Sequence, residues 1–112
     1  MQIFLSMDEN EQLAGLINKD LGSLEENLVI PVSGLDRNVI REKLAVLIAH
    51  LIQNNFEKLC QAMYRLDVSE AKFDRVMNEK PVEEIPYAIA DLVIEREMQK
   101  VRTRIMYKRG EL

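Results

Sequence analysis

The sequence contains one cysteine, one histidine, no tryptophan, four glycines and three prolines. The single cysteine, Cys60, excludes a disulfide framework within the chain. It is typical of proteins from a reducing compartment, so we expect a cytoplasmic location. With so few glycines and prolines, collagen-like and low-complexity chains are excluded as well.

Long hydrophobic runs are also lacking. The longest apolar stretch, Leu44 to Ile52, is interrupted by His50 and is far shorter than the roughly 20 residues that cross a bilayer. The first five residues carry no basic side chain, and no small-residue cleavage site follows them. We therefore expect neither a signal peptide nor a membrane partner.

The remaining composition is typical of one globular, acidic domain. The chain has 112 residues, of which 47% are hydrophobic and 30% charged, with a formal net charge of −4. A chain of this length buries roughly two-thirds of the surface that it exposes when unfolded. We predict a single domain over residues 1–112 that needs no metal, disulfide or cofactor to fold.

The N-terminal third combines a helical segment with an extended one. Ser6 begins a capping-box pattern ahead of a helix predicted over about residues 7–21, and Gly22 is its expected terminator. Residues 28–32 are β-branched and include a proline, which favours extended backbone. We expect a buried extended connection there, and its pairing with residues 2–5 remains an open alternative.

The second predicted helix is unusually long. Asp36 is its expected N-cap, and an apolar stripe at helical spacing continues to about residue 66, interrupted only by polar residues near Asn54 and Asn55. An unbroken helix over 37–66 would be about 45 Å long, whereas a compact chain of this size is only about 34 Å across. The helix must therefore break near Asn54 and Asn55 or bury its excess length against a second chain.

Two further helices complete the predicted fold. Ser69 is the expected N-cap of a short helix over about residues 70–78, and Pro86 suits the first turn of a C-terminal helix that ends near Gly110. The sequence thus predicts an all-α, single-domain bundle of about four helices, in which the long second helix and the long C-terminal helix pack antiparallel.

Residues that could perform catalysis are scarce. His50 and Cys60 are ten positions apart, which separates them by about 15 Å along a straight helix, too far for a nucleophile–base pair. The sequence has no metal-ligand spacing and no glycine-rich phosphate loop. We predict that the protein is not an enzyme, that Cys60 is a small core residue and that His50 lies at the rim of the core.

Charge is distributed unevenly. Residues 1–35 contain six acidic side chains and one basic side chain, whereas residues 99–112 contain five basic and one acidic. A basic ridge is predicted on the C-terminal helix, formed by Arg96, Lys100, Arg102, Arg104, Lys108 and Arg109. The ridge could bind an acidic partner, either nucleic acid or protein. Alternatively, it could complement the helix dipole and meet the acidic first helix of the same chain or of a neighbouring one.

Residues 62–78 resemble a helix-turn-helix of the repressor type. The resemblance rests on the spacing of Val68, Ser69, Phe73 and Val76. It implies that the second helix would read bases in the major groove. The segment departs from the pattern at Met63, where a small residue is usual, and at Asp67, where glycine usually makes the turn. Its second helix is also electrically neutral, whereas DNA binding draws affinity from basic side chains.

These features lead to two hypotheses about function. The first is a non-enzymatic protein-interaction module that self-associates as a homodimer through the long second helix and the C-terminal helix. The alternative is a small nucleic-acid-binding regulator that uses residues 62–78 together with the basic ridge.

Overall fold

The computed structural model describes residues 9–22 and 36–110, and no strand occurs in these two ranges. The predicted all-α class is confirmed. The helices are α2 (Glu9–Leu21), α3 (Arg37–Asn54), α4 (Phe56–Leu66), α5 (Glu70–Glu79), the 3-10 helix η1 (Val82–Glu84) and α6 (Ile85–Lys108). The capping box predicted at Ser6 and the extended connection over 28–32, with its open pairing to 2–5, lie outside the described residues.

Helix ends fall where local capping chemistry predicts them. The Asp36 side chain accepts a hydrogen bond from the Val39 amide at 3.0 Å, and the Ser69 hydroxyl accepts one from the Lys72 amide at 3.3 Å. Both bonds satisfy amides in the first turn of a helix, which have no carbonyl partner within it. After α6, Gly110 adopts a positive φ of 76°, which glycine tolerates readily.

The long second helix is broken at Asn55, so the alternative of one unbroken helix over 37–66 is wrong. Asn55 leaves helical geometry, with φ −160° and ψ 72°. Its amide still donates to the Leu51 carbonyl at 2.8 Å, while its side chain accepts from the Lys58 amide at 3.1 Å. One residue therefore ends α3 and caps α4, which is why the described residues form five α-helices instead of about four. The break also removes helix length as an argument for a dimer.

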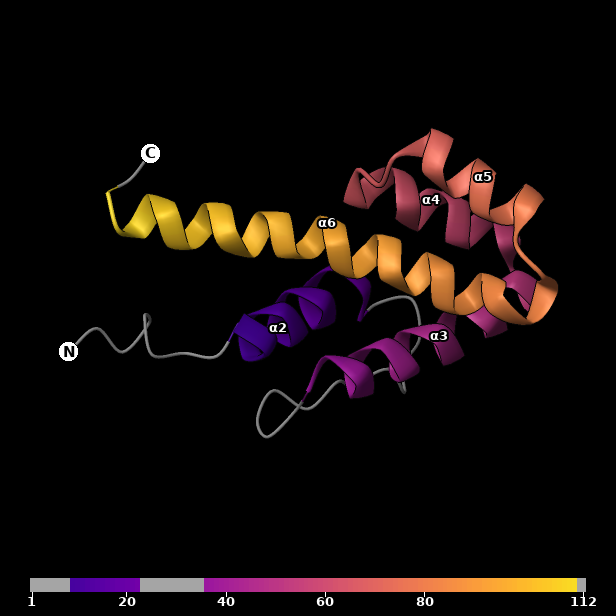
Figure 1. Cartoon of the computed structure of the whole chain (residues 1–112), viewed down its shortest axis with the longest axis horizontal. Helices are drawn as coiled ribbons and strands as arrows, with labels where there is room; N and C mark the ends of the chain where they lie inside the picture. The colour runs from indigo at the N-terminus through magenta and orange to yellow at the C-terminus, as the bar shows by residue number, and fades with distance from the viewer. Residues whose placement is uncertain (1–8, 23–35, 111–112) are drawn as a thin grey trace.

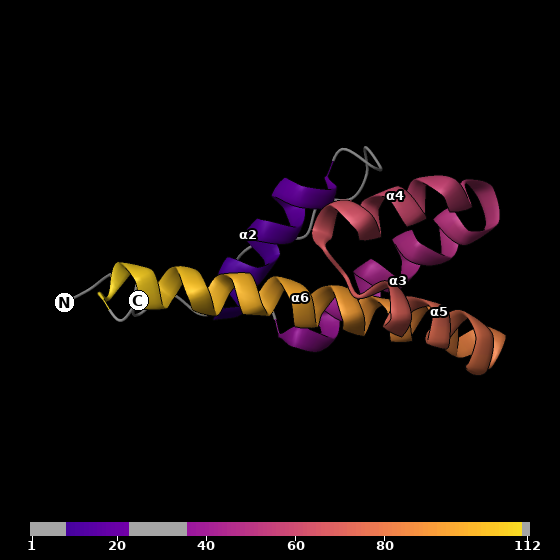
Figure 2. The same ribbon diagram turned by 90° about the horizontal axis from the view of Figure 1, so that it is seen from above.

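Helix α6 is the central helix of the fold, because it contacts every other described helix. In Figure 1, α2 and α3 lie below α6, and α4 and α5 lie above it. The most extensive packing is between α3 and α6, which run in opposite directions in this view, as predicted for the second and last helices. Figure 2 shows that α3 also rises away from α6 toward its C-terminal end.

Apolar side chains of α2, α3 and α6 form much of the core. Leu13 and Ile17 of α2, Leu44 of α3, and Ile89 and Val93 of α6 are all fully buried. None of the described helices combines the length and apolar character needed to cross a bilayer.

Tyr87, near the start of α6, belongs to a polar clamp between α3 and α6. Its hydroxyl donates to Glu42 at 3.1 Å, and the Arg41 guanidinium lies 4.9 Å from the centre of its ring. Arg41 also donates two hydrogen bonds to Asp91, at 2.8 and 3.2 Å. This end of the interface therefore joins the helices by polar contacts at the surface instead of by apolar burial.

Candidate interaction site at the α4–α5 turn

The turn between α4 and α5 is made by Asp67 in a left-handed conformation, with φ 62° and ψ 39°. The Asp67 amide donates to the Tyr64 carbonyl at 3.1 Å, and the Val68 amide donates to the Met63 carbonyl at 3.0 Å. This pair of bonds is the Schellman arrangement that commonly ends helices. Asp67 thus supplies the backbone geometry for which glycine is usual in a helix-turn-helix.

Replacing Asp67 tests this turn. Asp67→Gly is expected to change the free energy of unfolding by less than about 1 kcal/mol, because glycine adopts the left-handed conformation without strain. Asp67→Val is expected to destabilise by about 1–2 kcal/mol, because a β-branched side chain is strained there. Urea unfolding of both variants measures the difference. Equal stabilities would contradict the left-handed turn.

Helices α4 and α5, on either side of the turn, pack on α6 more extensively than on each other. In both views they run in opposite directions along the molecule. Met63, which stands where a helix-turn-helix usually has a small residue, is buried and lines the space between them. A large side chain at this position is consistent with helices that do not approach closely.

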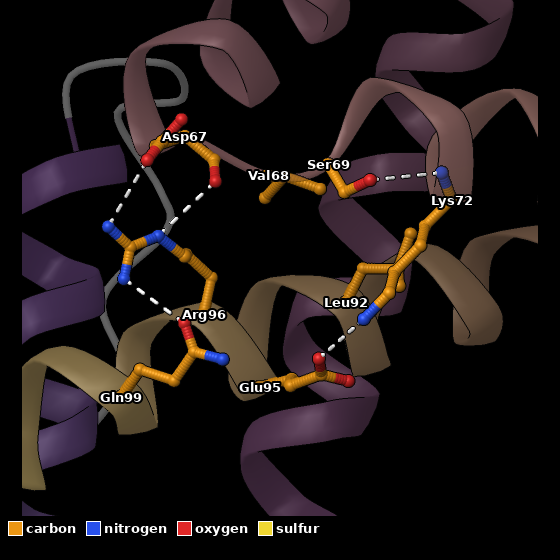
Figure 3. Close-up of a pocket in the computed structure, with 8 residues that line it drawn as sticks. All are labelled: Asp67, Val68, Ser69, Lys72, Leu92, Glu95, Arg96 and Gln99. Carbon is orange, nitrogen blue, oxygen red and sulfur yellow. Dashed lines mark hydrogen bonds and ion pairs between the residues drawn. The ribbon is translucent and has the colours of Figure 1, made fainter.

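On the side facing α6, the turn borders a polar hollow of about 340 Å³ (Figure 3). Arg96 donates from Nε to the Asp67 carbonyl at 3.2 Å and from a terminal nitrogen to the Gln99 side chain at 3.2 Å. Lys72 donates to Glu95 at 2.9 Å across the same hollow. These polar groups pair with one another, and the Arg96 and Lys72 contacts hold α4 and α5 against α6.

On its outer side, the turn borders a second hollow of about 430 Å³, which we call the α4–α5 groove. Its lining residues are Cys60, Met63, Tyr64, Asp67, Val68, Ser69, Glu70, Phe73 and Asp74. Tyr64 is 87% exposed, and the Phe73 ring packs against Phe56 with ring centres 6.3 Å apart. Apolar side chains therefore line a groove that remains open to solvent.

Acidic side chains stand at the edge of this groove. Glu70 and Asp74 are exposed and form no side-chain ion pair with any described residue. Asp67 is the third acidic residue of the lining, and its carboxylate lies 3.4 Å from Arg96. The α4–α5 groove is therefore apolar inside and negatively charged at its border.

The structure divides the predicted basic ridge into two parts. Arg96 is held by Asp67, while Lys100 lies 3.6 Å from Asp20 of α2 and 3.4 Å from Glu97. Lys100 therefore meets the acidic first helix, as the internal interpretation of the ridge expected. The remaining members lie on exposed positions near the end of α6: Arg102, Arg104, Lys108 and Arg109.

Glu97 is a buried carboxylate that the sequence analysis missed. Its side chain is fully buried, and neither oxygen accepts a hydrogen bond of ordinary geometry within the described residues. Burial raises the pKa of Glu97 to about 7, the neighbouring Asp20 carboxyl adds to this increase, and Lys100 opposes it. The available signal was its position on the apolar face, three residues after Ile94 and four before Val101.

His50 and Cys60 lie on different helices, α3 and α4. His50 is exposed near the end of α3, in keeping with a place at the rim, and Asn54 lies 3.2 Å from its ring nitrogen. Cys60 is half-buried and packs against the core while also lining the α4–α5 groove. Within residues 9–22 and 36–110, no three or more His, Cys, Asp or Glu side chains are grouped so that they could hold a metal ion.

The chain was compared with known proteins at the level of families, individual sequences and structures. No protein family, curated protein or solved structure matches it. Any function must therefore be inferred from the chemistry of the α4–α5 groove and the charged surfaces around it.

Proposed function

We propose that the protein is a non-enzymatic interaction module that binds a basic, amphipathic protein segment in the α4–α5 groove. The observation that carries the proposal is an open apolar groove bordered by the carboxylates of Glu70 and Asp74, which form no ion pair within residues 9–22 and 36–110. Its volume of about 430 Å³ lies within the range of roughly 300–1,000 Å³ that is usual for binding pockets. We also propose a cytoplasmic location, which the single Cys60 supports.

The groove selects for a particular partner chemistry. An apolar side chain entering it would cover the exposed ring of Tyr64 and the little surface that Val68 and Phe73 still expose, which supplies binding energy. Arginine or lysine beside that anchor would face the acidic border, which adds specificity and speeds association. Helices that lay an apolar anchor into a groove between two helices are a recurrent form of peptide recognition.

The proposal predicts that a basic amphipathic helix protects the thiol of Cys60. Because Cys60 is the only cysteine of the chain and lines the groove, its alkylation rate reports on occupancy. We expect a synthetic peptide with tyrosine and arginine on one face to slow the reaction with N-ethylmaleimide. The same peptide with glutamate for arginine should leave the rate unchanged.

A matched pair of variants controls this measurement. Glu70→Lys with Asp74→Lys should abolish protection by the basic peptide, whereas Glu79→Lys with Glu83→Lys makes the same charge change away from the groove lining. If the basic peptide gives no protection, or protects equally after both changes, the groove is not the binding site.

Nucleic acid binding is the second candidate. Arg102 and Arg104 are exposed near the end of α6 and form no ion pair with a described residue, which supports a contact with phosphate. By contrast, α5 gains no free positive charge from Lys72, which pairs with Glu95. A salt-dependent titration with duplex DNA tests this candidate, and it predicts weaker binding when both arginines are replaced by glutamine.

A further inference from the structure

The end of α6 has an outward face whose chemistry is the reverse of the α4–α5 groove. Met106 is 39% exposed and Tyr107 is 73% exposed, although both belong to a helix whose inner face packs on the core. At 100° per residue, they lie on the side of the helix opposite Val101, and Arg102 and Arg104 flank them on either side. The outer face at this end of α6, formed by Arg102, Arg104, Met106 and Tyr107, is called the α6 tip below.

Neither arginine of the α6 tip is engaged within the described structure. Both side chains are exposed and form no ion pair there. Figure 1 shows the last turns of α6 extending past α2, away from α4 and α5. The α6 tip therefore combines exposed apolar side chains with positive charge that no described residue pairs. The α4–α5 groove of the same chain lies elsewhere on the fold.

We propose that the occupant of the α4–α5 groove is the α6 tip of a second copy of this chain. The inference rests on the proposed function and names its partner. Tyr107 and Met106 would enter the groove beside Met63 and Phe73, and the two arginines would face Glu70 and Asp74. Polarity and charge are both complementary, since the tip is apolar with a basic border and the groove is apolar with an acidic one.

The position of the two surfaces permits a closed dimer. The α6 tip and the α4–α5 pair lie toward opposite ends of the molecule in Figure 1. Two copies placed antiparallel would each insert a tip into the groove of the other, so that both contacts form in one two-fold assembly. Such a reciprocal arrangement doubles the contact area and leaves no unfilled groove, whereas a one-way contact would continue as an open chain.

The first experiment measures the mass of the protein by size-exclusion chromatography with light scattering, from micromolar to submillimolar concentration. We expect the mass to rise from that of one chain, 13.0 kDa, to that of two as concentration increases. Added salt should weaken the dimer, because exposed charges are screened. A mass of one chain across the whole range would overturn self-association.

Charge reversal then tests both surfaces. Arg102→Glu with Arg104→Glu alters the tip, and Glu70→Lys with Asp74→Lys alters the groove. Each double variant is expected to raise the dimer dissociation constant at least roughly tenfold, because like charges would face each other. Glu79→Lys with Glu83→Lys is the control for net charge and should dimerise like the original protein. Tyr107→Ser tests the apolar anchor without changing charge, and Val82→Ser is its control, since Val82 is 80% exposed.

Mixing the two charge variants gives the sharpest result. In a reciprocal dimer of one tip variant and one groove variant, an unaltered tip meets an unaltered groove, and the reversed tip meets the reversed groove. Both contacts then pair opposite charges, so we expect the mixture to recover dimer that neither variant forms alone. Failure to recover it, or undiminished dimerisation of each variant alone, would refute the reciprocal contact.

These outcomes separate the two proposals. If the protein remains a single chain but a basic peptide still protects Cys60, self-association is wrong and the interaction module stands. If the peptide also fails to protect Cys60, both proposals are wrong. Circular dichroism of every variant checks that the exposed substitutions leave the helices intact.

Discussion

Glu97→Gln is expected to stabilise the protein above neutral pH and to remove most of the decline in stability between weakly acidic and neutral conditions. The folded-state pKa of Glu97 is about 7, compared with an ordinary value of 4.5. Between these values the folded protein holds a proton that the unfolded chain has released. Stability therefore falls as pH rises through this window, and the loss is complete above the folded pKa.

The size of the effect follows from the shift in pKa. One pKa unit corresponds to about 1.4 kcal/mol, so ionising Glu97 in the folded protein costs about 3 kcal/mol. Glutamine has a similar shape but cannot ionise, so the variant avoids this cost. Part of the gain in stability is offset because Lys100 loses its ion pair with Glu97, although it keeps its ion pair with Asp20.

Urea unfolding at several pH values measures this prediction. Asp20, Arg65 and Lys100 line a small cavity of about 90 Å³ at the junction of α2, α4 and α6, and Asp20 and Lys100 set the charge around Glu97. Asp20→Asn should therefore shift the pH dependence, while Glu79→Gln, at an exposed position on α5, should not. If Glu97→Gln instead lowers stability at every pH, Glu97 is ionised and acts mainly as the ion-pair partner of Lys100.

Leu44→Ala is expected to lower the free energy of unfolding by about 3 kcal/mol, within the usual range of about 2–5 kcal/mol for a buried leucine. Leu44 is fully buried on α3, the helix that packs most extensively on α6. The truncation removes apolar contacts and leaves a cavity that close-packed neighbours fill only in part. Since a domain has only about 5–15 kcal/mol of net stability, the loss is a large fraction of the total.

Val46→Ala is the matched control for this prediction, because Val46 lies on the same helix and is 70% exposed. It should change stability by less than about 0.5 kcal/mol. Denaturant titration of both variants gives the comparison. Because alanine favours the helix at least as well as leucine or valine, helix propensity cannot cause a loss at either position. Similar losses would therefore contradict the assignment of the Leu44 effect to its packing on α6.

The positions of most helices follow from local sequence signals. Asp36 and Ser69 each cap an amide three residues later, so the chemistry that starts α3 and α5 is contained within one turn. The prediction for α6 was one residue late, because Ile85 precedes Pro86 in the helix. The choice at Asn55 between a break and an unbroken helix stayed open, because asparagine suits both a cap and a seam between paired helices.

The candidate site was less accessible to sequence reasoning. Residues 62–78 stood out as two capped helices around a turn, and the structure places the α4–α5 groove there. The sequence did not show that Asp67 makes the turn in a left-handed conformation, or that α4 and α5 pack on α6 more extensively than on each other. The basic ridge looked continuous because its members repeat along one helix. It is divided because the partners of Arg96 and Lys100 come from other elements.

The sequence by itself determined the helical class, the caps and most of the buried stripes, since these depend on contacts between residues three or four positions apart. Only the tertiary structure decided that Glu97 is buried beside Asp20, that Arg102 and Arg104 stay exposed, and that a groove opens between α4 and α5. Each of these depends on how distant helices are placed against α6. Burial and charge pairing arise from that placement, because a side chain's surroundings are supplied by elements far away in the chain.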